Sequence, residues 1–104
     1  MGINLRLNDN DGNMLAQVSD GEEILRKFLG SVKVEHTVCL RFVDPDGDTI
    51  FNQRQIPVLI EELESLGSLI RDRLTGLHLE KVLALAREGE GLPGAYVWFY
   101  AKEE

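Results

Sequence analysis

The sequence predicts a single α+β domain over residues 1–104, with a largely antiparallel sheet of four to five strands and helices packed on one face. Three observations lead to this fold class. The chain has 104 residues, which suits one domain with one hydrophobic core. Apolar residues recur with strand-like and helix-like periods in the order β-β-α-β-β-α-α-β. Two hairpin-like turns and the lack of a repeated βαβ pattern favour antiparallel pairing.

The first two strands are predicted to form a hairpin over residues 3–19. Asp11-Gly12 supplies the turn. Apolar residues alternate with mostly polar ones on both sides of it, at Ile3, Leu5 and Leu7 and again at Met14, Ala16 and Val18. A short helix should follow, begun by the carboxylate of Asp20, with Glu23 reaching back, and ended by Gly30.

The β-rich segment 37–43 predicts a third strand, with Arg41 and Cys39 on one of its faces. An acidic turn over 44–48 should return the chain to a short strand over 49–51. The strand, turn and helix start of 38–60 are expected to be the unit that the other elements cover.

The longest helix is predicted to begin near Gln55 or Ile56, because Pro57 is best tolerated in a first helical turn. Gly67 should weaken its middle, and Gly76 should separate it from a second helix over roughly 77–88. A Gly- and Pro-containing loop then leads to a last strand over 95–101.

The net charge of −7, from 18 acidic and 11 basic residues, excludes several partners. Nucleic acids and anionic membrane surfaces both require a cationic protein surface, so neither is expected to bind. No stretch has the length of a membrane span, and the start of the chain does not read as a signal peptide. We therefore expect a cytoplasmic protein.

No catalytic, metal or cofactor site is predicted. Asp44, Asp46 and Asp48 have the alternate spacing of a calcium loop, but Thr49 and Gln55 stand where that loop needs Gly and Glu. A solvated turn is the preferred interpretation, and cation binding by these three carboxylates is left open.

Cys39 is the single cysteine, and a nucleophile at this position would take His36 or His78 as its base. Its mid-strand position, without an activating context, favours a buried structural thiol. Zinc is not expected, because the chain lacks a second cysteine and any close histidine pair.

The last strand carries the strongest functional signal. Val97 and Phe99 are expected to face the core, which leaves Tyr96, Trp98 and Tyr100 for the opposite face. Tyr and Trp suit a recognition surface, and Arg41 would extend it from the neighbouring strand. Two alternatives are left open: the rings face the core or lie beneath a loop, or they form a homodimer by stacking.

The residues of the central segment resemble a group of small uncharacterised bacterial proteins. The matching residues are Leu40-Arg41-Phe42-Val43-Asp44-Pro45, then Gly47-Asp48-Thr49, then Phe51-Asn52 and Gln55. The likeness covers mainly residues 38–66 and the closing aromatic strand. It implies a bacterial origin and a compact accessory protein, and it carries over no activity.

The preferred hypothesis is a non-enzymatic interaction protein that binds a protein partner through the aromatic sheet face and acidic surface. An immunity or antitoxin-like protein that neutralises a basic toxin is its concrete form. The alternative is a small-ligand-binding domain with a pocket between the sheet and the long helix. An enzyme that uses carboxylates ranks last.

Overall fold

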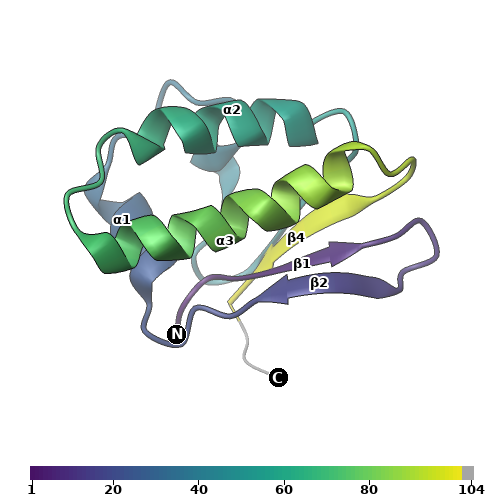
Figure 1. Ribbon diagram of the computed structural model, residues 1–104, viewed down its shortest axis with the longest axis horizontal. Helices are drawn as coiled ribbons and strands as arrows, with labels where there is room; N and C mark the ends of the chain where they lie inside the picture. Colours follow the sequence, from purple (N-terminus) through teal and green to yellow (C-terminus); the bar gives the residue numbers. More distant parts are fainter. Residues whose placement is uncertain (102–104) are drawn as a thin grey trace.

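A four-stranded antiparallel sheet and three helices make up the fold in the computed structural model, which describes residues 1–101 (Figure 1). The strand order is β2-β1-β4-β3, and every neighbouring pair is antiparallel. The strands are β1 (Asn4–Asn8), β2 (Met14–Val18), β3 (Asp48–Phe51) and β4 (Tyr96–Tyr100). The predicted fold class is confirmed, with one strand fewer than the predicted order contains.

The three helices are α1 (Ile24–Ser31), α2 (Ile56–Gly67) and α3 (Arg73–Glu90). In Figure 1, α2 and α3 run side by side over one face of the sheet, and α1 lies at the end of the molecule where α3 begins. The later start predicted for α2 is confirmed. Asn52 and Gln55 exchange side-chain to backbone hydrogen bonds of 2.9 and 3.1 Å in the turn just before it.

The predicted boundary between the two C-terminal helices is wrong. Gly67 ends α2, and Gly76 lies inside α3, which has 18 residues against 12 for α2. The carboxylate of Asp72 starts α3 by accepting hydrogen bonds from the amide and the hydroxyl of Thr75. A cap of this kind and the packing of the helix outweigh the cost of about 1 kcal/mol for one internal glycine.

The predicted strand over residues 37–43 does not form. This segment contains the short 3-10 turn η1 (Leu40–Phe42) instead, so the expected hairpin over 37–51 is also wrong. The carboxylate of Glu62 on α2 accepts the backbone N–H groups of Val38, Cys39 and Leu40 at 2.5–3.1 Å. A β ladder would need some of these same donors, so the carboxylate favours the turn.

The hydrophobic core lies between the helices and the covered face of the sheet. Val97 and Phe99 of β4 are fully buried there, as predicted. The ring of Phe99 meets that of Phe51 edge-on, with their centroids 5.6 Å apart. Gly89 of α3 lies so close to Leu7 of β1 that a Cβ there would come within 2.5 Å of Leu7 Cδ1. The helix therefore packs directly on the sheet.

Candidate functional site

The face of the sheet away from the helices is the strongest candidate for a binding surface. Strand register and alternation place on it Asn4, Arg6, Asn8, Met14, Gln17, Asp48, Ile50, Tyr96, Trp98 and Tyr100. We call this set the open face. Its middle row runs across all four strands, from Gln17 through Arg6 and Trp98 to Ile50. Tyr96, Trp98 and Tyr100 thus lie opposite the core, as the sequence predicted.

Arg6 holds the centre of the open face together. Its guanidinium carbon lies 5.6 Å from the ring centroid of Trp98 and 5.0 Å from that of Tyr100. The two rings are 5.5 Å apart and inclined by 50°. Both contacts lie within cation–π range. A cation in contact with both rings keeps them in one arrangement, so this centre is ordered before any partner arrives.

Hydrogen bonds fix both tyrosines as well. Asn8 Nδ2 donates to the Tyr96 hydroxyl at 3.1 Å, and Gln17 Nε2 donates to the Tyr100 hydroxyl at 2.8 Å. Tyr100 is only 4% exposed, so it supports the surface more than it forms it. Tyr96 and Trp98 are half-buried.

Ile50 is the most accessible apolar side chain of the open face, with 55% exposure. The indole Nε1 of Trp98 is buried without an acceptor among residues 1–101. The accessible apolar part at the centre of the open face therefore consists of Ile50, Trp98 and Tyr96, supported from below by Tyr100.

Carboxylates stand at both ends of the open face. Asp9 and Asp11 lie in the β1–β2 turn, beyond Asn8, and Asp46 and Asp48 lie at the opposite end. Hydrogen bonds from the backbone and side chain of Asn13 lower the pKa of Asp9, which keeps this carboxylate ionised. The arrangement is an aromatic centre between two acidic ends.

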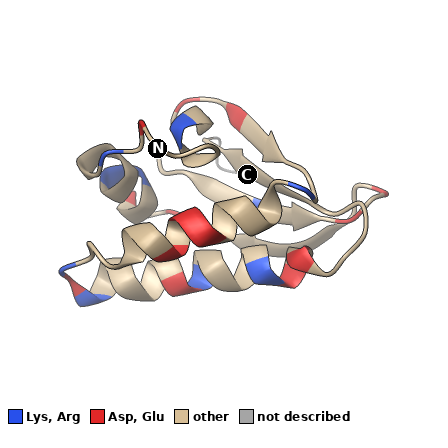
Figure 2. Cartoon of the chain, turned by 90° about the horizontal axis from the view of Figure 1, so that it is seen from above, with Lys and Arg blue, Asp and Glu red and all other residues tan. Residues whose placement is uncertain are grey.

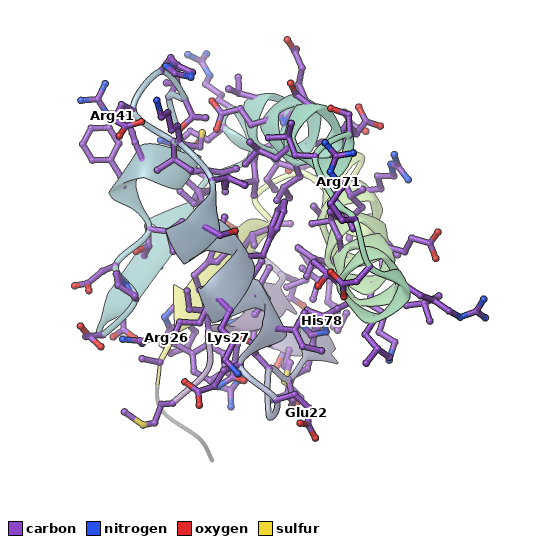
Figure 3. All side chains as sticks on the ribbon, turned by 90° about the vertical axis from the view of Figure 1, so that its left-hand side faces the viewer. Glu22, Arg26, Lys27, Arg41, Arg71 and His78 are labelled. Carbon is purple, nitrogen blue, oxygen red and sulfur yellow. The ribbon has the colours of Figure 1, made fainter. Side chains whose placement is uncertain are left out.

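Arg41 lies elsewhere. It belongs to η1, whereas the strands beside β4 are β1 and β3. The prediction that Arg41 extends the aromatic surface from a neighbouring strand is therefore wrong. Its guanidinium lies 5.1 Å from the ring of its exposed neighbour Phe42, and Figure 3 shows it pointing away from the molecule. The cation of the open face is Arg6, which sequence reasoning passed over as the polar side of a strand.

The acidic turn is structured by its own hydrogen bonds. Asp44 Oδ1 accepts the amide N–H of Asp46, and the Asp46 carboxylate pairs with Arg26 of α1 at 2.9 Å. Within residues 1–101, no group of three or more His, Cys, Asp or Glu side chains is arranged to hold a metal ion.

Cys39 is buried, as predicted, although it precedes η1 instead of lying in a strand. Burial raises the pKa of its thiol, and the charge of Glu62 raises it further. Less thiolate is then present at neutral pH, which is the opposite of what a nucleophilic cysteine needs.

Asp20 and His78 form a buried pair, and the sequence did not predict that these two side chains meet. The Asp20 carboxylate accepts amide N–H groups from Ile3, Leu25 and Arg26 at 2.9–3.1 Å. Its predicted role at the start of α1 is thus confirmed, whereas Glu23 pairs with the N-terminal amine at 3.5 Å instead of reaching back.

His78 Nε2 lies 3.3 Å from Asp20 Oδ1 but is not aligned for a hydrogen bond. Burial lowers the pKa of His78, and Asp20 opposes this shift only in part. The many amide contacts of Asp20 make this pair a junction between β1, α1 and α3.

A groove of about 940 Å³ lies between α1, residues 32–38 and α2. Apolar side chains such as Phe28 and Leu66 line it together with Lys33, His36 and Arg71. Figure 3 shows Arg71 on the side of the groove where α2 passes into α3. The groove does not lie between the sheet and the long helix, where the alternative hypothesis expected a pocket.

Comparisons of the chain with protein-family models, curated proteins and solved structures found no match. The resemblance of residues 38–66 to small bacterial proteins therefore stays an expectation. Within residues 1–101, no helix combines the length and the apolar character needed to cross a lipid bilayer.

Proposed function

We propose that this protein is a non-enzymatic interaction module that binds a basic protein partner through the open face of its sheet. The carrying observation is the ordered centre of Arg6, Trp98 and Tyr100 between two acidic ends. Aromatic residues and arginine are enriched among the residues that dominate binding energy at interfaces. Acidic groups around such a centre steer a cationic partner and set its orientation.

An immunity or antitoxin-like role in the bacterial cytoplasm is the concrete form of the proposal. The net charge of −7 suits neutralisation of a basic toxin. Pre-ordering of the aromatic centre supports tight binding, because little side-chain entropy is left to lose when the partner docks.

The test compares two substitutions with the same change of charge. Ile50→Lys places a cation in the middle of the open face, and Leu74→Lys places one on α3 at a side chain with 68% exposure. Both positions are exposed, so both variants should fold. Partners would be captured from a lysate of the source organism, purified, and titrated against each variant.

We expect Ile50→Lys to weaken binding of the captured partner by tenfold or more, an effect of about 1.4 kcal/mol, whereas Leu74→Lys binds like the original chain. Binding should also weaken as salt is added, because the acidic ends contribute to it. Equal affinities for the two variants would refute the proposal.

A second candidate function is binding of a small ligand in the groove beside α2. The volume of about 940 Å³ favours it, since pockets for small molecules span roughly 300–1,000 Å³. Ser65→Trp would fill this groove from an exposed position of α2. If a fragment screen by NMR shifts groove amides, and Ser65→Trp abolishes those shifts, ligand binding is supported. A screen without such shifts counts against it.

A further inference from the structure

The two edges of the sheet differ in how they are covered. Beside β3, the Thr49 hydroxyl accepts the amide N–H of Asp44 and lies 3.4 Å from the carbonyl oxygen of Phe42, so residues 42–44 run along that edge. The outer edge of β2 has no strand partner within residues 1–101, and Figure 1 shows β2 as the outermost strand. An edge of this kind presents unpaired N–H and C=O groups to any strand that reaches it.

β2 also lacks the side chains that usually protect an edge. Its sequence, Met-Leu-Ala-Gln-Val, contains no charged residue and no proline. The irregularity in its pairing with β1 lies at the Met14 end, where Leu15 is the extra residue. Ala16, Gln17 and Val18 pair regularly, and this part is free to accept another strand.

Above this edge, a groove of about 500 Å³ separates β2 from α3. Small and apolar side chains line its middle, among them Ala16, Val18 and Ala84, and Lys81 and Glu88 of α3 border it. Small side chains allow a neighbouring backbone to come close. The groove therefore continues the open edge toward the helix layer.

Lys81 and Glu88 lie at opposite ends of the groove. His78 of α3 is beside Asp20, just after β2, and Gly89 is beside Leu7, whose strand neighbour is Ala16. The helix thus runs antiparallel to β2, with Lys81 toward the end of the strand and Glu88 toward its start.

Neither Lys81 nor Glu88 has an ion-pair partner within the described part of the chain. Figure 2 shows basic and acidic residues both distributed along α3, instead of one sign collecting there. One cation and one anion, both unpaired, thus border the same open edge.

We propose that a second copy of this chain docks on this edge. The β2 strands would pair antiparallel about a two-fold axis near Gln17, giving a continuous sheet of eight strands, four from each copy. The two-fold brings Lys81 of each copy toward Glu88 of the other. Such self-complementarity is what an isologous interface requires.

Charge favours this occupant over an unrelated extended peptide. A peptide gains nothing from a cation at one end of the groove and an anion at the other unless its own charges happen to match, whereas a second copy matches by symmetry. The proposal is independent of a partner on the open face, because pairing through β2 leaves Ile50 and Trp98 uncovered.

Charge reversal on the full chain tests the proposal. Lys81→Glu and Glu88→Lys each set like charges against each other at both ends of the interface, and the double variant restores opposite pairs. Lys27→Glu and Glu22→Lys, at exposed positions outside the β2–α3 edge, are the charge-matched controls. Sedimentation equilibrium from about 1 μM to about 1 mM would give the dimer dissociation constant of each protein.

We expect a dimer whose dissociation constant rises about tenfold in each single variant and returns to within about threefold in the double variant, with both controls unchanged. Hydrogen exchange should slow at the outward amides of Ala16–Val18 as the dimer forms. A chain that stays monomeric at every concentration would overturn the proposal. This holds also if the monomer binds an extended peptide at β2. A dimer insensitive to the single reversals, or one that the double variant does not restore, would overturn it too.

Discussion

Replacing Asp20 with alanine should destabilise the protein more than any other single carboxylate change at a helix start. The substitution leaves three amide N–H groups without their acceptor, those of Ile3, Leu25 and Arg26. Hydrogen bonds to a charged group contribute about 1.5–3 kcal/mol each, and their loss is not additive. Removing one side of a buried charged network costs about 3–5 kcal/mol, which is the loss we expect here.

Such a loss is a large part of the 5–15 kcal/mol that stabilises a typical domain of about this size. It corresponds to a fall in Tm on the order of 20 °C, at about 4–8 °C per kcal/mol. Asp72→Ala is the matched control, because Asp72 also begins a helix but is exposed. Its loss should cost much less, because water can replace an exposed acceptor.

Urea unfolding followed by circular dichroism at pH 7 measures both free energies. The expected result is a loss for Asp20→Ala at least twice that for Asp72→Ala. Equal losses would refute the view that Asp20 is the junction of β1, α1 and α3. An Asp20→Ala chain too unstable to fold would be replaced by Asp20→Asn, which keeps the size of the side chain and should still lose more than the control.

Burial lowers the pKa of His78, so the unfolded chain takes up a proton at higher pH than the folded one. The free energy of unfolding should therefore fall as pH drops from about 7.5 through the ordinary histidine pKa near 6.5. Urea titrations at several pH values should show a flatter pH profile for His78→Gln. Gly89→Ala should lower the free energy of unfolding by about 1–3 kcal/mol, because the added methyl group clashes with Leu7. Gly30→Ala has open space around it and should be neutral or stabilising. Thermal unfolding of the two variants compares them. Glu62→Gln weakens the acceptor of three amides and should cost about 1–3 kcal/mol, seen in urea titrations, with faster hydrogen exchange confined to residues 38–40.

Regular alternation in the sequence was enough to predict most of the sheet. β1 and β4 follow a period of two, whereas β2 follows it only from Ala16 to Val18, because Leu15 is an extra residue. The residues of β4 divide between core and open face as the pattern requires. The start of α2 was also predictable, because Pro57 restricts the chain locally. These features depend on neighbours in the sequence, and local patterns record such neighbours well.

Features decided by distant residues were missed. Residues 37–43 have strong β propensity, yet the carboxylate of Glu62, more than 20 positions away, takes their amides and gives a turn. The contact of Arg6 with two rings depends on how β1 and β4 align. Gly76 was expected to break a helix, and the cap at Asp72 together with packing overrides its weak propensity.

The chain contains a single tryptophan, Trp98, and it lies at the centre of the open face. Replacing it with 5-fluorotryptophan gives one ¹⁹F NMR signal that reports on this surface alone. Titration with the captured partner should shift or broaden that signal in step with binding, and Ile50→Lys should move the change to higher partner concentrations. A signal that stays unchanged at saturating partner would contradict the open face as the binding surface.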